Sequence, residues 1–138
     1  MPRHMNHHVV LELAVQWGEM DALGHVNNTR FFTWFESARI ELARRTGMYD
    51  EASLLIPVLV NTACDYLKPV VFPAQVCIGV SVTAVGKSSV SMEYAVWRKG
   101  EPEVLHARAT SVVVMVDRTT RDKALIPDAL RGRLTLLG

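Results

Sequence analysis

The sequence lacks a large charge of either sign and has few cysteines. Its 138 residues include 15 Lys and Arg against 14 Asp and Glu, which gives a formal charge of +1. This balance argues against nucleic-acid binding driven by bulk positive charge and leaves only a local basic patch open. The only cysteines are Cys64 and Cys77, which share no CxxC spacing and have no histidine pair nearby. We therefore expect two buried free thiols in a reducing compartment, which predicts a cytoplasmic protein.

Long apolar runs, repeats and linkers are also missing. No apolar run reaches the about 18–20 residues that a membrane-spanning helix needs, so no membrane span is expected. The segment VVLELAV near the N-terminus is short and carries Glu12, which does not fit a signal peptide. We expect a single domain over residues 1–138, with residues 1–8 as a loose tail. His4, His7 and His8 in that tail lack the carboxylate or cysteine that would complete a metal site.

Hydrophobic periodicity predicts one strand followed by one long helix. Residues 9–17 alternate, with Leu11, Leu13, Val15 and Trp17 on one side, as in a half-buried strand. Residues 28–46 change to helical spacing, with an apolar face formed by Phe31, Trp34, Phe35, Ala38 and Leu42.

Local signals place the two ends of this helix. Asn27 or Asn28 is a suitable N-cap, and Gly47 suits the left-handed position after the last turn. Within the helix, Glu41 is spaced to pair with Arg45. The helix is therefore expected to begin and end close to these residues.

The rest of the chain is mostly strand-like. Strands are expected at residues 57–67, 75–85, 89–98 and 104–117, and a short helix at 127–137. We expect the four consecutive strands to form an antiparallel meander. One helix with five strands predicts an α+β domain in which a twisted antiparallel sheet wraps around the long helix. The uncovered sheet edges favour a homodimer or a homotetramer.

The polar block WGEMDALGHVNN stands directly before the apolar helix. It is followed by FFTWFESAR and later by DYLKPVVFPAQV and VGKSSVSMEY. In this combination the chain resembles the hot-dog-fold acyl thioesterases, in the branch of 4-hydroxybenzoyl-CoA thioesterase, over about Leu11 to Leu130. The order of one strand, one central helix and further strands matches the hot-dog order.

The resemblance implies a set of site residues. Asp21 matches the catalytic carboxylate, and Asn28 matches the residue whose backbone N–H polarises the thioester carbonyl. His25 and Asn27 match positions of the similar plant acyl-carrier-protein thioesterases. Those enzymes carry an asparagine where this chain has Leu23, so an asparagine-assisted mechanism is not carried over.

The resemblance also implies the substrate. Lys87, with Ser88 beside it in GKSS, matches a basic position that contacts the nucleotide end of CoA. The implied substrate is an acyl-CoA or an acyl carrier protein thioester, and no cofactor is implied beyond the CoA of the substrate.

The chemistry of thioester hydrolysis explains why such residues stand before a helix. Attack on the carbonyl carbon creates an oxyanion, and the free N–H groups at a helix N-terminus stabilise one. Asp21 can then act as a general base or as a nucleophile. The alternative interpretation is structural, because Asp, Gly and Asn are common in turns, and His25 can equally be a structural histidine. A metal site is not expected, since Asp21 and His25 are too few ligands.

Two other functions remain open on the sequence. A hydratase or dehydratase of the same fold uses an Asp-x4-His block, whereas the spacing here is Asp21-x3-His25. A non-catalytic acyl-ligand binding protein is the third hypothesis, although no DNA-binding segment supports a regulator.

Overall fold

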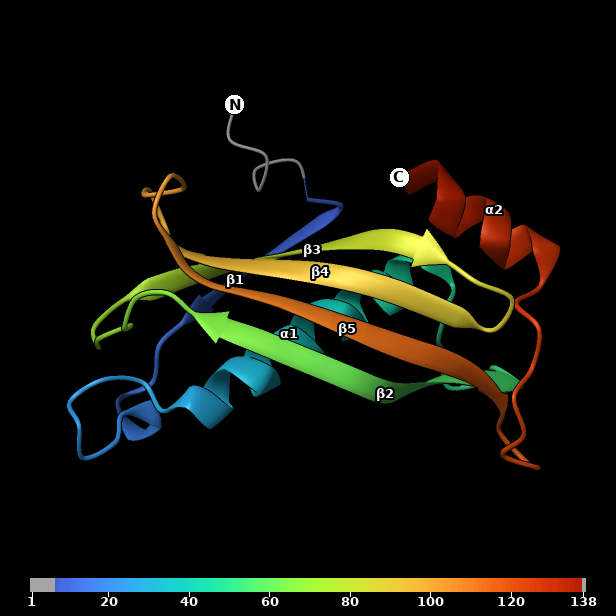
Figure 1. Cartoon of the computed structure of the whole chain (residues 1–138), viewed down its shortest axis with the longest axis horizontal. Coiled ribbons are helices and arrows are strands. Elements are labelled where there is room, and N and C mark those ends of the chain that lie inside the picture. Colours follow the sequence, from blue (N-terminus) through green and yellow to red (C-terminus); the bar gives the residue numbers. More distant parts are fainter. Residues whose placement is uncertain (1–6, 138) are drawn as a thin grey trace.

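The structure is a computed structural model, and it describes residues 7–137. Five strands and two helices follow one another in the order shown in Figure 1, with a short 3₁₀ helix at Trp17–Glu19 after the first strand. The strands and helices are β1 (Val9–Ala14), α1 (Asn28–Thr46), β2 (Leu55–Tyr66), β3 (Gln75–Val85), β4 (Ser89–Arg98), β5 (Leu105–Asp117) and α2 (Asp128–Leu137).

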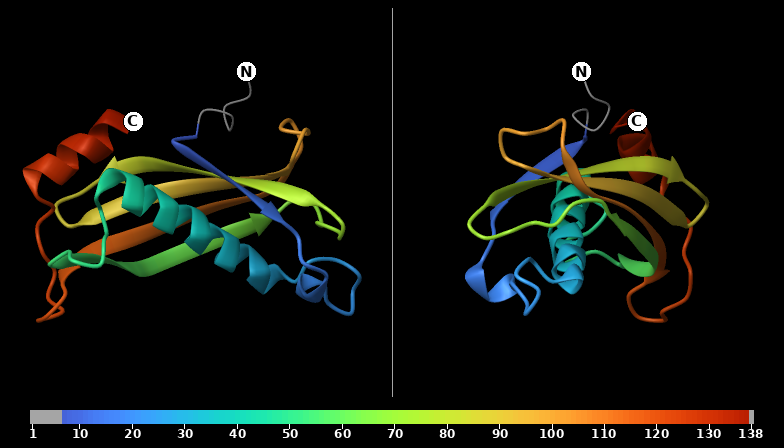
Figure 2. Two further views of the ribbon diagram at one scale, coloured as in Figure 1. Left: turned by 180° about the vertical axis from the view of Figure 1, so that it is seen from behind. Right: turned by 60° about the vertical axis from the view of Figure 1, so that its left-hand side comes forward.

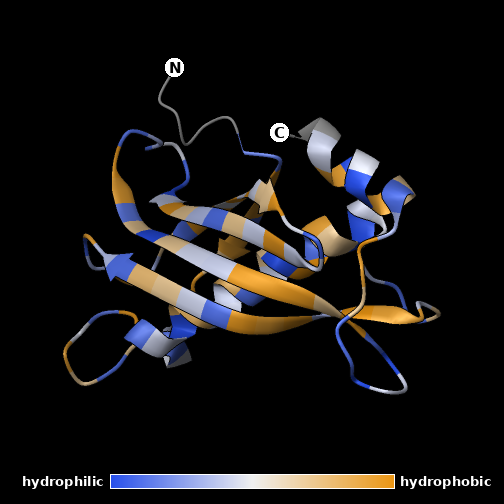
Figure 3. Cartoon of the chain, turned by 45° about the vertical axis from the view of Figure 1, so that its right-hand side comes forward, coloured by the Kyte–Doolittle hydropathy of each residue, from blue (hydrophilic) through white to orange (hydrophobic). Residues whose placement is uncertain are grey.

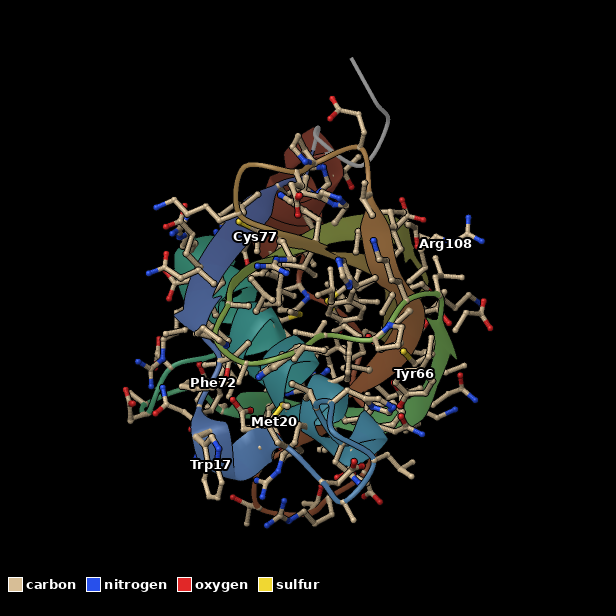
Figure 4. The ribbon with its side chains drawn as sticks, turned by 90° about the vertical axis from the view of Figure 1, so that its left-hand side faces the viewer. Trp17, Met20, Tyr66, Phe72, Cys77 and Arg108 are labelled. Carbon is tan, nitrogen blue, oxygen red and sulfur yellow. The ribbon has the colours of Figure 1, made fainter. Side chains whose placement is uncertain are left out.

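The sheet has the strand order β1-β3-β4-β5-β2, and every neighbouring pair is antiparallel. The predicted four-stranded meander is therefore wrong for its first strand, because β2 pairs with β5 and not with β3. The segment 67–74 carries Pro69 and Pro73 and does not close a tight hairpin. It crosses instead from β2, at one edge of the sheet, to β3, which lies next to the opposite edge strand β1, and it passes the residues just before α1. Figure 4 looks at this end, with Tyr66 and Phe72 on opposite sides of the helix.

Helix α1 lies along the concave side of the sheet, and Figure 2 shows the sheet curving around it. The predicted apolar face is buried, since Phe31, Trp34, Phe35, Ala38 and Leu42 are all at most 4% exposed. This burial of large apolar side chains is the main stabilisation of the helix, because propensity alone rarely stabilises a single helix.

Both predicted helix ends are confirmed. The side chain of Asn27 accepts a hydrogen bond from the Thr29 N–H, which identifies Asn27 as the N-cap. Gly47 adopts a φ of 79°, the left-handed conformation in which glycine ends a helix without steric cost. The predicted pair of Glu41 and Arg45 is formed at 2.8 Å.

The predicted position of Trp17 is wrong. Strand β1 ends at Ala14, the chain then turns into the short 3₁₀ helix, and the Trp17 side chain is 75% exposed. The alternation of a strand no longer applies once the backbone leaves the sheet. For this reason Val15 is buried as predicted, whereas Trp17 is not.

The last two residues of the expected N-terminal tail are packed against the sheet. The His8 N–H donates to the Val80 carbonyl, and the Val82 N–H donates to Nδ1 of His8. The ring of His7 stacks on Trp97 at 5.7 Å and lies directly over Gly79, where a larger residue would collide with it. The prediction of a loose tail is thus wrong for His7 and His8. Residues 1–6, which include His4, lie outside the described residues.

One edge of the sheet is long, apolar and open. In the part of the chain that the structure describes, β2 pairs only with β5, and Val58, Leu59 and Val60 are 37%, 43% and 59% exposed. Figure 3 colours much of this strand as hydrophobic. Within residues 7–137, no helix is both long enough and apolar enough to cross a membrane.

Candidate active site

Glu19 fixes the entry into the polar block before α1. One carboxylate oxygen of Glu19 accepts the Gln16 N–H at 2.8 Å, and the other accepts Nε1–H of Trp34 at 3.0 Å. The Glu19 carbonyl also accepts the Asn27 N–H at 3.0 Å. Glu19 therefore holds Gln16 and Asn27, on either side of it in the chain, and also links the segment to Trp34 on the buried face of α1. Its role is structural.

A tight turn brings Asp21 back to the start of the helix. Its Oδ1 accepts the Leu23 N–H at 2.9 Å, and its carbonyl accepts the Gly24 N–H at 3.1 Å. Gly24 has a φ of 85°, which a side chain would disfavour. The Asp21 N–H then donates to the His25 carbonyl, and this bond closes the turn.

Asn27 joins the carboxylate of Asp21 to the first turn of α1. Its Nδ2 donates to Oδ2 of Asp21 at 3.0 Å. Its Oδ1 accepts from the Thr29 N–H at 3.0 Å and from the Thr29 hydroxyl at 2.6 Å. The two donors at Thr29 fix the amide orientation, so Nδ2 can only face Asp21. One side chain thus caps the helix and holds the carboxylate.

The helix start leaves a donor for a ligand. Asn28 is the first residue of α1, its side chain is exposed, and its backbone N–H has no acceptor among residues 7–137. Asp21 is half-buried, and each of its oxygens accepts one of the bonds above, although a carboxylate can accept about four. A carboxylate and a free N–H therefore lie on either side of the same capping residue.

A small cavity of about 160 Å³ opens beside this helix start. His25, which is half-buried, lines it together with Asn28 and Phe31 from the helix. The opposite wall comes from Tyr66, the last residue of β2, and from Leu67, Lys68 and Pro69 of the β2–β3 crossover. The Tyr66 hydroxyl donates to the Asn28 carbonyl at 2.9 Å.

The wall of this cavity was not predicted from the sequence. DYLKPVVFPAQV contains Tyr66 and Lys68, and it carried part of the family resemblance. Periodicity along the chain does not say which end of β2 lies beside the helix, so these residues were not recognised as part of the site.

Lys87 and Ser88 are not brought to this place within one chain. They form the β3–β4 turn, where the Lys87 carbonyl accepts the Ile126 N–H and the Ser88 carbonyl accepts the Met115 N–H. In Figure 1 this turn lies at the α2 end of the sheet, opposite the start of α1. Asp21, His25, Asn27 and Asn28 are thus gathered in one place, and the predicted CoA contacts are at the far end.

The two thiols are free, as predicted, although Cys64 is only partly buried while Cys77 is buried. Burial raises the pKa of the Cys64 thiol to about 11, although a hydrogen bond with Tyr66 opposes the increase. A thiol with such a pKa is a weak nucleophile, because the thiolate is the reactive form. Across residues 7–137, no three His, Cys, Asp or Glu side chains are grouped so that they could hold a metal ion.

Comparison with known proteins adds the family. A family model of the thioesterase-like superfamily matches residues 15–134. The chain therefore belongs to this superfamily, and the hot-dog fold and the resemblance to thioesterases predicted from the sequence are confirmed.

Individual proteins are similar to this chain in sequence or in structure. The YsmA protein of Bacillus subtilis (strain 168) is 34% identical over 83 residues, which are 60% of this chain and only 56% of YsmA. The PA5185 protein of Pseudomonas aeruginosa PAO1 has a similar structure, with a TM-score of 0.86, 29% identity, and coverage of 97% of this chain and 94% of that one. A thioesterase of Thermus thermophilus, crystallised with coenzyme A and Zn, has a TM-score of 0.81 and 30% identity, covering 96% and 95% of the two chains.

The raised pKa of Cys64 can be tested by titration of its thiol. In the Cys77→Ser variant, where Cys64 is the only thiol, the ultraviolet absorbance of the thiolate should reach its midpoint near pH 11 in the folded protein. In denaturant the midpoint should fall to about 8.5, the value of a free cysteine. Between these two midpoints the unfolded chain has lost its proton and the folded chain has kept it, so stability should fall as the pH rises. A folded-state midpoint equal to that in denaturant would contradict the burial of this thiol.

Proposed function

We propose that this protein is an acyl-CoA thioesterase, which hydrolyses a thioester to a free acid and CoA. The observation that supports this most is the arrangement at the start of α1. A carboxylate, Asp21, is hydrogen-bonded to the N-cap residue of a buried helix whose first N–H has no acceptor among the described residues. Membership of the thioesterase-like superfamily and the CoA complex of the Thermus relative agree with it.

The proposed reaction uses the two halves of this arrangement. The thioester carbonyl oxygen accepts the Asn28 N–H, where the positive end of the helix dipole stabilises the developing oxyanion. As a general base, Asp21 takes a proton from water while the water oxygen attacks the carbonyl carbon. The carbonyl then re-forms, the carbon–sulfur bond breaks, and the CoA thiolate leaves and is protonated.

The covalent route uses the same groups. Asp21 would attack the carbonyl carbon itself, displace the CoA thiolate and form an anhydride that water then hydrolyses. Both routes need only the protein, the thioester and water, so the proposal includes no metal or redox cofactor. His25 lines the cavity and is placed to contact the acyl group or the attacking water.

The substitution Asp21→Asn tests this function. We expect kcat for acyl-CoA hydrolysis to fall by at least about a hundredfold, because the variant has no carboxylate to accept the proton or attack. In this variant the side-chain NH2 group at position 21 also faces the NH2 group of Asn27, so that two donors oppose each other. The free energy of unfolding should therefore fall by about 1 kcal/mol, as for a weakened cap.

The assay should follow thiol release from short, long and aromatic acyl-CoA substrates, with the melting temperature measured on the same samples. Hydration of crotonyl-CoA is measured in parallel, since a hydratase of this fold would show that activity instead. A wild-type protein that binds acyl-CoA tightly without turnover would be a binding protein, and a folded Asp21→Asn variant with wild-type kcat would refute the mechanism.

We further propose a homodimer formed through β2, which leaves a dimer of dimers possible as the larger assembly. An open edge strand presents unpaired N–H and C=O groups to another strand, and β2 is long and apolar. A two-fold axis would pair β2 with its copy in antiparallel fashion. The Tyr66 end of one subunit would then lie beside the Leu55 end of the other.

This pairing would also bring Lys87 to a site. Leu55 pairs with Asp117 and Ser89 pairs with Val114, so the β3–β4 turn lies at the Leu55 end of the sheet. The start of α1 lies at the Tyr66 end, because the Tyr66 hydroxyl bonds to Asn28. In the proposed dimer, Lys87 and Ser88 of one subunit approach the helix start of the other, where they are suited to contact the nucleotide end of CoA.

Two matched substitutions test the dimer. Val60→Lys places a charge on the β2 edge, and we expect light scattering to give a monomer because a buried unpaired charge is costly in an apolar interface. Val10→Lys places the same charge at a 42% exposed position of β1, the opposite edge, and should leave the dimer intact. A monomeric wild-type protein at micromolar concentration, or loss of the dimer in Val10→Lys alone, would contradict the β2 interface.

A further inference from the structure

His106 makes hydrogen bonds that no part of the proposed chemistry uses. It lies on β5 and is 2% exposed. Its ring Nδ1 is 3.0 Å from the carbonyl oxygen of Pro69 and 3.2 Å from that of Lys68. Its own carbonyl accepts the N–H groups of Leu67 and Lys68 at 2.9 and 3.1 Å. One residue of β5 therefore binds three consecutive residues of the β2–β3 crossover.

The surroundings of the ring fix its tautomer. Both atoms near Nδ1 are carbonyl oxygens, which can only accept, so Nδ1 carries the proton and donates it between them. The other ring nitrogen, Nε2, is buried without a hydrogen-bond partner among residues 7–137. A buried acceptor without a partner is unfavourable, and an apolar residue would avoid it. The favourable contribution of this histidine is therefore its Nδ1–H bond to the crossover.

The crossover that His106 holds is the wall of the candidate site. Lys68 and Pro69 line the cavity opposite His25 and Asn28. The next residue, Val70, is buried, and its carbonyl accepts the Val26 N–H at 2.8 Å. Val26 stands between His25 and Asn27. The position of the wall is thus transmitted directly to the residues that would bind the thioester.

We propose that His106 is a positioning residue that sets the width of the cavity at the start of α1. It does so by holding the Lys68 and Pro69 carbonyls with its Nδ1–H. The consequence for catalysis rests on the proposed thioesterase function, because the cavity would hold the thioester carbonyl and the start of the acyl group. A small displacement of such a wall misaligns the carbonyl with the Asn28 N–H and with Asp21.

Two substitutions of His106 separate its donor from its volume. In His106→Asn the side-chain amide nitrogen can occupy the place of Nδ1 and donate to the same carbonyls. In His106→Leu the volume is similar and the donor is lost. We expect His106→Leu to lower kcat by about tenfold to a hundredfold, as for misplaced reacting groups, and His106→Asn to keep kcat near the wild-type value.

A control variant removes a comparable bond at the far end of α1. Nε of Arg133 donates to the Thr46 carbonyl at 2.6 Å, so Arg133→Leu loses one such bond far from the cavity. We expect a lower melting temperature with unchanged kcat per folded molecule. If His106→Leu behaves in the same way as Arg133→Leu, the role of His106 is structural only and the proposal is refuted.

Amide hydrogen exchange tests, without any substrate, whether His106 holds the crossover in place. In His106→Leu the Val26 amide should exchange faster than in the wild-type protein, while the Met115 amide, bonded to Ser88 at the other end of the sheet, should not change. In His106→Asn both amides should exchange as in the wild type. Equal protection of the Val26 amide in all variants would refute the positioning role of His106. A wild-type protein that hydrolyses no thioester would refute the proposed function, but the exchange result would remain valid.

Discussion

The side chain of Asn27 is the constraint on which the candidate site depends. A helix that begins inside a protein has free N–H groups, and one of them is satisfied here by Oδ1 of Asn27. Because that oxygen is committed to Thr29, the amide nitrogen must point to Asp21. The same side chain therefore caps the helix and orients the carboxylate, and a change in one of these two contacts affects the other.

The rest of the fold makes this arrangement rigid. The apolar face of α1 is buried in the curved sheet, so the helix end does not move freely (Figure 2). The Trp34 indole holds Glu19, and the Val70 carbonyl holds Val26, on either side of the turn that contains Asp21. Groups that stabilise a transition state are most effective when their positions are set before the substrate arrives, and the hydrogen bonds around this turn meet that requirement.

The elements of this protein could be predicted where their signals are local. The limits of α1 follow from Asn27 and Gly47, and β3 and β4 follow from alternation between clear turns. The pairing of β2 with β5 could not be predicted, since it depends on residues about fifty positions apart and on the helix between β1 and β2. The same holds for the site. Asp21, His25, Asn27 and Asn28 are close in sequence. Tyr66 reaches the helix start from the end of β2, Lys68 lies on the crossover, and His106 bonds to that crossover from β5.

We propose that the site requires the carboxylate of Asp21 itself, and not merely the hydrogen bonds that this side chain accepts. The double exchange Asp21→Asn with Asn27→Asp tests this directly. Asn at 21 can donate to Asp at 27 and still accept the Leu23 N–H, and Asp at 27 can accept both donors of Thr29. We expect a melting temperature near that of the wild type, with kcat for acyl-CoA hydrolysis at least about a hundredfold lower. Hydrolysis at the wild-type rate by the exchanged protein would contradict this role, and the catalytic group would then have to be sought among the residues that line the cavity, with His25 first.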